Sequence, residues 1–375
     1  MAQNPFRYGS PVGDPYFVGR ARELDVLLDR MGNGINVVVT APRRYGKTSL
    51  LERAADRLAG DGGSVLRANL LLTPSFESLA GRLTTEAYEL PGGAWRRAVQ
   101  AIPEYLRRLR LHPTVGVDDT GRPVFSFAGG LQAADAGQLL EDVYALLAEV
   151  AEERPVALLL DEFQAVADLD RALPGRLKAL ADAHPRVALV MAGSTEHLME
   201  SLVLARGAPL YQMAERLALG PIDQAEMAGF LRARSRVGGK PMTPGAAGRI
   251  RDLAGPIPYD IQRLAYEVFA SAASAIDEGA VEDGLARVVA HEAESHAERF
   301  SRFSLGQRRA LVVLAADGGT TRPQSAAFAR ATGYANPAGS AKALRSLAAD
   351  ETVVRRSGTW LVADPFFREW LRQSG

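Results

Sequence analysis

Cysteine is absent from this chain of 375 residues, which excludes both disulfide bonds and thiolate metal sites. No apolar run approaches the roughly 20 residues that span a bilayer, and the first residues lack a signal-peptide pattern. We therefore expect a cytoplasmic protein without a membrane partner. Lysine is also scarce, since only four of the 44 basic residues are lysine. We interpret this scarcity as the codon habit of a GC-rich genome, so abundant arginine alone says little about partners.

The charges are balanced in total but unevenly placed. The chain has 44 basic and 44 acidic residues, and 47% of it is hydrophobic, enough to fill the cores of two or three domains. Residues 301–375 contain 11 basic and five acidic residues, a net charge of +6, which leaves −6 on the remainder. A basic tail indicates either an anionic partner or docking on the acidic body of the same chain.

A phosphate-binding turn after the apolar run at 37–39 is the clearest functional signal. It ends in Gly46-Lys47-Thr48, the second half of the pattern G-x-x-x-x-G-K-[ST]. Backbone N–H groups of such a turn surround the phosphates, the lysine reaches the β- and γ-phosphates, and the hydroxyl binds Mg²⁺. Ala41 replaces the first glycine, and its methyl group is tolerated if φ stays negative. We expect ATP and Mg²⁺ here, with the phosphates contacting Ala41, Pro42, Arg43, Arg44, Tyr45, Gly46, Lys47, Thr48 and Ser49.

Two adjacent acids, Asp161 and Glu162, follow a second apolar run at 156–160. Such a run is typical of a strand buried on both faces. Parallel strands bind ligands beyond their carboxyl ends, where the phosphate turn also opens. We expect Thr48 and Asp161 to hold the metal, Asp161 through water, and Glu162 to polarise the attacking water. The acids would also suit the start of the following helix.

The order of elements predicts an α/β protein with a parallel sheet in its first part. We expect a P-loop NTPase core over residues 1–220, with an insertion at about 92–135 whose role stays open. A wholly helical lid domain follows at 221–300, and a winged helix-turn-helix domain at 301–375. The expected strands lie at 35–40, 64–70, 156–160, 187–192 and, as a short fifth, 217–219. The expected lid helices lie at 224–234, 246–254, 259–273 and 280–297.

Three further positions are candidates for the nucleotide site. Ser194, after the fourth strand, places a hydroxyl near the γ-phosphate edge, where it would orient water or cap the next helix. Phe17 and Val18 precede the first strand and would contact the adenine, unless they form an ordinary loop. Pro258 suits the first turn of a lid helix. Arg263, on the same helix, would reach the phosphates or pair on the lid surface.

These motifs together resemble the archaeal-type ATPases, a family of the STAND branch of AAA+-like P-loop proteins. The resemblance covers nearly the whole chain and includes the additional strand and catalytic glutamate of that class. It implies an ATP-driven switch in which nucleotide state alters lid position and assembly. The matching segments are Phe17 to Leu24, Pro42 to Leu51, Asp161-Glu162-Phe163-Gln164, Gly193-Ser194 and Pro258-Tyr259-x-Ile261-Gln262.

The chain departs from the family pattern before the fifth strand. The family commonly has Leu-Tyr-Gly-Arg where this chain has Leu-Tyr-Gln-Met at 210–213, so an expected arginine is missing. Arg206 or Arg216 would substitute as a finger presented to a neighbouring subunit, or each is an ordinary surface arginine. A homo-oligomer therefore stays open.

The last 75 residues have the pattern of a winged helix. Helical spacing is present at 305–316, 323–331 and 337–347, and residues 352–362 predict a hairpin that turns at Ser357-Gly358. In a DNA-binding version, Ser340, Lys342 and Arg345 would face the major groove while Arg355 and Arg356 contact phosphates. The third helix offers few base-reading side chains, and winged helices of this family also contact proteins. Duplex DNA and a protein partner are both open.

We therefore expect an ATP-binding and ATP-hydrolysing switch, with Glu162, Lys47 and Ser194 as its catalytic residues. The alternative is a nucleotide-gated DNA-binding protein, similar to replication initiators or transcription regulators, in which hydrolysis is slow and incidental.

Overall fold

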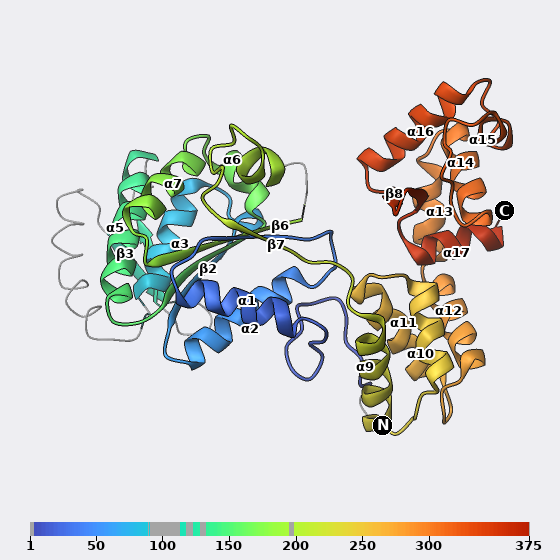
Figure 1. Cartoon of the computed structure of the whole chain (residues 1–375), viewed down its shortest axis with the longest axis horizontal. Helices are drawn as coiled ribbons and strands as arrows, with labels where there is room; N and C mark the ends of the chain where they lie inside the picture. Colours follow the sequence, from blue (N-terminus) through green and yellow to red (C-terminus); the bar gives the residue numbers. More distant parts are fainter. Residues whose placement is uncertain are drawn as a thin grey trace. The chain divides into compact units, whose positions relative to one another are not determined.

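A computed structural model of the chain describes residues 4–88, 90, 113–117, 123–127, 133–194 and 199–374. The chain forms two compact units (Figure 1). Residues 11–221 form one, and residues 222–375 together with the first ten residues form the other. We call them the core unit and the helical unit.

The core unit contains a five-stranded parallel sheet with the order β2-β5-β6-β1-β7. Strand β6 therefore lies between β1, which leads into the phosphate turn, and β5, which ends in the two acids. This additional strand confirms the predicted fold class. The strands are β1 (Val37–Thr40), β2 (Ser64–Asn69), β5 (Val156–Asp161), β6 (Val187–Gly193) and β7 (Glu215–Ala218).

Helices cover both faces of this sheet (Figure 1). On one face α3, α5 and α7 bury an apolar cluster that includes Leu79, Leu140 and Tyr144 against the strands. On the other face α1 and α2 bury Leu27 and Leu50. The bounds are α1 (Ala21–Gly32), α2 (Lys47–Gly60), α3 (Phe76–Tyr88), α5 (Ala133–Ala151), α6 (Val166–Leu169) and α7 (Leu173–Ala183), with short turns η1 (Leu70–Leu72), η2 (Phe163–Ala165) and η3 (Glu200–Leu204).

The predicted insertion at 92–135 contains an antiparallel pair, β3 (Pro113–Val117) and β4 (Pro123–Phe127). Helix α5 begins at the end of this range. The other residues of the insertion lie outside the part of the chain that the structure describes.

The helical unit begins with α9 (Gln224–Val237), α10 (Pro244–Ala254) and α11 (Pro258–Ser271). Side chains of Asp223 and Thr243 cap the first two helices, as expected for these residue types. The single helix predicted at 280–297 is wrong, because Glu292 leaves helical geometry and separates α12 (Glu278–His291) from α13 (Ala293–Ser301).

The first described residues pack on these helices. The Phe6 side chain is 2% exposed, and its ring meets Phe269 edge-on with centroids 6.1 Å apart. Asn4 donates a hydrogen bond to the Tyr266 carbonyl (2.9 Å), and Arg234 donates one to the Pro5 carbonyl (3.0 Å). Residues 4–6 are therefore part of the helical unit's core, although they precede the core unit in sequence.

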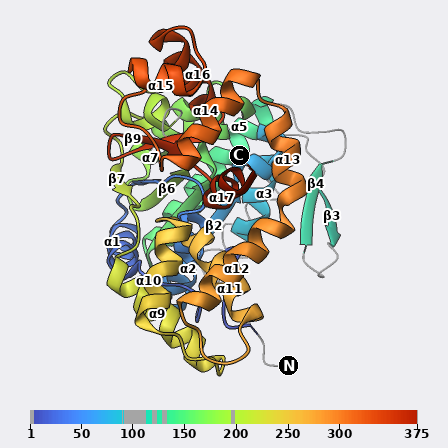
Figure 2. The same cartoon turned by 90° about the vertical axis from the view of Figure 1, so that its right-hand side faces the viewer.

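The winged helix comprises α14 (Leu305–Ala316), α15 (Ala326–Ala331), α16 (Pro337–Ala349), β8 (Val353–Arg356), β9 (Thr359–Val362) and α17 (Pro365–Ser374), drawn in orange to red in Figure 2. Leu314, Leu344 and Phe367 contribute to its buried cluster. Ser357 and Gly358 both have positive φ, 47° and 84°, which confirms the predicted hairpin turn and suits a two-residue connection.

Helix α17 of the winged helix packs against the lid helices. Arg368 donates to the Leu253 carbonyl (3.2 Å), and the Arg263 guanidinium lies 4.9 Å from the centroid of the Phe366 ring. Arg263 also pairs with Glu292 at 2.6 Å. The helices of this unit therefore form one packed body. None of the described helices is long and apolar enough to cross a membrane.

Candidate nucleotide-binding site

The phosphate turn connects β1 to α2 at the carboxyl edge of the sheet. Gly46 precedes α2 with φ of 83°, and Arg44 has φ of 67°. These left-handed residues curl the backbone, so that the N–H groups at the start of α2 point into one concavity, where the helix dipole favours an anion. Ala41 is not among the described residues with positive φ. Its methyl group is therefore compatible with the turn.

The cation and the two acids converge beside this turn. Lys47 Nζ lies 3.5 Å from Asp161 Oδ1 and 3.5 Å from Glu162 Oε1. Thr48 Oγ1 donates a hydrogen bond to Asp161 Oδ2 (2.7 Å). Lys47 and Asp161 are 6% and 8% exposed, so this charge cluster is screened less than a surface pair. The two motifs expected to form one site, about 115 residues apart in sequence, are adjacent in the structure.

Glu162 has an unusual backbone and a crowded carboxylate. Its φ of 53° is left-handed, a conformation rarely adopted by a non-glycine residue. Glu162 Oε2 accepts hydrogen bonds from Gln164 Nε2 and from Ser194 Oγ, the latter at 3.4 Å. The structure thus places Ser194 next to Glu162. Thr195, beside it in sequence, lies outside the described residues.

The buried side chain of Arg20 contacts the backbone of the phosphate turn. It was not predicted as a site residue. Its side chain is 3% exposed. Arg20 Nη2 donates to the carbonyls of Tyr45 (3.2 Å) and Gly220 (2.6 Å), and Nη1 pairs with Glu23 (2.9 Å). An arginine that ends a Val-Gly-Arg segment gave only a weak sequence signal, because its carbonyl partners carry no side-chain signature.

The segment that contains Phe17 and Val18 packs along α2. Val12 N donates a hydrogen bond to Ser49 Oγ (2.9 Å), and the Phe17 ring lies 5.9 Å from the Arg53 guanidinium. The Ser49 hydroxyl oxygen therefore contacts the N-terminal segment as an acceptor. Phe17 and Val18 are half-buried.

The remaining candidates lie elsewhere. Pro258 begins α11 in the helical unit. Arg263 has its guanidinium paired with Glu292, the second of the two roles considered for it. Arg206 and Arg216 are both exposed, and Arg216 Nε donates to Thr40 Oγ1 (3.3 Å) at the end of β1.

The oxygen atoms present suit Mg²⁺. This cation prefers octahedral oxygen ligands and keeps several waters, so one or two protein oxygens suffice when phosphates supply the rest. Thr48 Oγ1 and Asp161 Oδ2 are such a pair. In the described part of the chain no group of three or more His, Cys, Asp and Glu residues forms a metal cluster. The site therefore fits a nucleotide-borne cation better than a dedicated protein cage.

The winged helix presents a different surface from the one predicted. Ser340 is fully buried and donates to the Pro323 carbonyl (3.0 Å), so its predicted position in a major groove is wrong. Lys342, Arg345 and Arg355 are exposed. A Cβ built on Gly255 of the lid would lie 3.6 Å from Arg356 Nη1, which places that guanidinium beside the lid helices.

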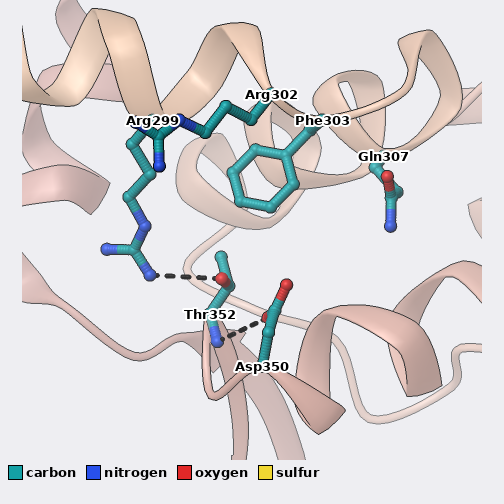
Figure 3. A pocket seen from close by; sticks show the side chains of 6 residues that line it. All are labelled: Arg299, Arg302, Phe303, Gln307, Asp350 and Thr352. Atoms are coloured by element: carbon teal, nitrogen blue, oxygen red, sulfur yellow. Dashed lines mark hydrogen bonds between the residues drawn. The ribbon is translucent and has the colours of Figure 1, made fainter.

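A pocket of about 400 Å³ opens beside the winged helix (Figure 3). Arg299 donates to Thr352 Oγ1 (3.1 Å) across it, and the Thr352 N–H donates to Asp350 (3.1 Å). Three of the lining residues are therefore hydrogen-bonded to one another, while Arg302 pairs with Glu298 and Gln307 bonds to Ser304 and Ser346 outside the lining. The lining residues are Arg299, Arg302, Phe303, Gln307, Asp350 and Thr352.

Comparison with known proteins agrees with this geometry. Residues 16–191 match the family described as AAA ATPase domain, and residues 294–373 match the family described as probable winged helix domain. A search of curated protein sequences found no match.

Two solved structures show the same fold. The Walker-type ATPase of Pyrococcus abyssi is 16% identical, with 98% of this chain and 99% of that chain covered and a TM-score of 0.63. The ORC2 protein of Aeropyrum pernix, solved as ADPNP-ADP complexes, is 16% identical, with 98% of each chain covered and a TM-score of 0.53. At these identities the likeness is one of fold.

Proposed function

We propose that this chain, whose residues 16–191 match an AAA ATPase domain and whose residues 294–373 match a winged helix domain, is an ATP-hydrolysing switch of the archaeal-type AAA+ P-loop family. The observation that carries the proposal is the convergence of Lys47, Thr48, Asp161 and Glu162 at one edge of the sheet. A phosphate cradle, a cation, a metal-binding hydroxyl and a carboxylate base are the groups that phosphoryl transfer to water requires. The ADPNP-ADP complexes of the ORC2 neighbour support an adenine nucleotide as the ligand.

The roles follow from the positions of the side chains. Lys47 exchanges its carboxylate partners for the β- and γ-phosphates when ATP binds. Thr48, and Asp161 through water, would hold Mg²⁺, which would neutralise charge on the phosphates. Glu162 accepts the proton of the attacking water, and Ser194 orients that water. Phe17 and Val18 are the proposed adenine contacts, and Pro258 is a proposed nucleotide-binding residue. Residues 11–220, 221–300 and 301–375 act as core, lid and winged helix, and the first ten residues pack with the helical unit.

The test is steady-state ATP turnover by the purified chain, with Lys47→Ala as the blank. Lys47→Ala should abolish ATP binding, because the cationic phosphate contact is lost. Glu162→Gln should retain ATP without turning it over, because an amide accepts no proton. Normal hydrolysis by the Glu162→Gln variant would remove this residue as the base and with it the proposed mechanism.

Nucleotide-gated DNA binding is the second candidate. It is favoured by the net charge of +6 on residues 301–375 and by the exposure of Lys342, Arg345 and Arg355. Turnover measured with and without duplex DNA separates the two functions. Strong stimulation would couple the winged helix to DNA. A rate indifferent to DNA would indicate a protein partner or a second copy of this chain, to which Arg206 or Arg216 would present a finger.

A further inference from the structure

Gln164 is held in a single orientation against Glu162. Its Nε2 donates to Glu162 Oε2, while its Oε1 is buried and has no hydrogen-bond partner among the described residues. Turning the amide over would place Oε1 against the carboxylate, where two acceptors repel each other. The donor end of the amide is therefore committed to Glu162.

The fit beneath Gln164 is tight. A Cβ built on Gly193, at the end of β6, would lie 2.8 Å from Gln164 Oε1 and 2.4 Å from Met199 Sδ. Contacts this short are not tolerated by real side chains, so the absence of a side chain at Gly193 is what leaves room for the amide. The Gly193-Ser194 pair thus serves Glu162 twice, because Gly193 admits Gln164 and the Ser194 hydroxyl adds a second donor.

The two carboxylate oxygens of Glu162 have different partners. Oε2 accepts from Gln164 and from Ser194, at 3.4 Å for Ser194, whereas Oε1 faces Lys47 Nζ at 3.5 Å. Once phosphates take Lys47, Oε1 loses its partner and Oε2 keeps both of its donors. Charge-assisted hydrogen bonds of this kind are stronger and more directional than neutral ones.

We propose that Gln164 is a positioning residue for ATP hydrolysis, which fixes Glu162 through Oε2 and leaves Oε1 as the atom that accepts the proton from water. This inference rests on the proposed function and deepens it. Without Gln164, and with Lys47 bound to the phosphates, the carboxylate of Glu162 keeps only the hydrogen bond from Ser194 Oγ at 3.4 Å. The Glu162 side chain has three rotatable bonds, so this one contact does not fix its position. The proton acceptor is then misplaced even though every catalytic group is present.

The test compares Gln164→Met with Gln138→Met in the full chain. Methionine matches glutamine in length but donates no hydrogen bond. Gln138 is the matched control, because its Nε2 also donates to a carboxylate, that of Asp142 at 3.5 Å, on α5 away from the phosphate turn. We expect Gln164→Met to lower kcat by about tenfold to a hundredfold, the scale of an ångström of misplacement, with ATP affinity and melting temperature unchanged. Gln138→Met should leave all three at wild-type values.

Three outcomes separate the possibilities. A wild-type kcat in Gln164→Met, with active wild-type protein, overturns the inference and leaves the proposed function standing. Loss of ATP affinity or of melting temperature in parallel with kcat also overturns it, because that result shows a structural role. An inactive wild-type chain overturns the proposed function and the inference together.

Discussion

Replacing Arg20 by methionine should lower the free energy needed to open the phosphate turn and the start of α2. Methionine retains most of the apolar stem but removes the guanidinium, whose Nη2 donates to the carbonyls of Tyr45 and Gly220. Hydrogen bonds from charged donors contribute about 1.5–3 kcal/mol each. At the lower end of this range, the two bonds together give an expected loss of about 3 kcal/mol in the free energy of opening around α2.

Hydrogen exchange of the backbone amides in residues 47–60 is the suitable assay, because it separates the core unit from the helical unit. A loss of about 3 kcal/mol corresponds to more than a hundredfold faster exchange, since each 1.4 kcal/mol is a factor of ten. ATP affinity should fall by about tenfold, because a less preorganised turn must be ordered on binding.

The control for Arg20→Met is Arg186→Met. Arg186 pairs with Glu152 in the core unit, but both side chains are more than 60% exposed, and exposed pairs contribute below about 1 kcal/mol. If Arg20→Met exchanged no faster than Arg186→Met, the hydrogen bonds of Arg20 would not support the turn.

Three further predictions concern the helical unit. Phe6→Ala should lower the free energy of unfolding of this unit by about 3–5 kcal/mol, the cost of emptying a buried phenylalanine site. An unchanged urea midpoint, followed by the fluorescence of the chain's three tryptophans, would contradict this. Burial lowers the pKa of His296 in the folded chain, so the unfolded chain binds the proton at a higher pH than the folded chain does. The free energy of unfolding should therefore fall as the pH drops below about 6.5, the pKa of histidine in the unfolded chain. In His296→Phe this contribution to the loss of stability should be absent. If DNA is bound, Arg355→Ala should flatten the salt dependence by about one phosphate contact, and an unchanged slope would exclude this side chain.

The sheet and the main parts of the site were predictable because their signals are local. A run of apolar residues followed by Gly-Lys-Thr, and another followed by Asp161 and Glu162, specify strand, turn and ligand groups within about ten residues each. The parallel arrangement then brings both strand ends to one edge. A strand at 187–192 followed from its apolar residues, whereas the place of β6 between β1 and β5 was implied by the resemblance to the additional-strand class.

The features that were not predicted depend on long-range packing. Arg20 acts through the carbonyl of Gly220, 200 residues away, and a carbonyl carries no sequence signal. The polar Ser340 was expected on the recognition surface, but the packing of α16 turns it inward onto the Pro323 carbonyl. The break at Glu292 interrupts a segment whose helical periodicity continues on both sides. In each case tertiary contacts, rather than local preference, decide the outcome.

The docking of residues 4–6 on the helical unit has a topological consequence. The chain passes from one unit to the other twice, once after residue 10 and once after residue 221. A protein cut once between residues 221 and 222 would remain joined through the N-terminal connection. Conversely, a fragment that starts at residue 222 would lack the ring that fills the space against Phe269. The helical unit is therefore a two-piece assembly, and the ribosome has synthesised all of the core unit before its second piece begins.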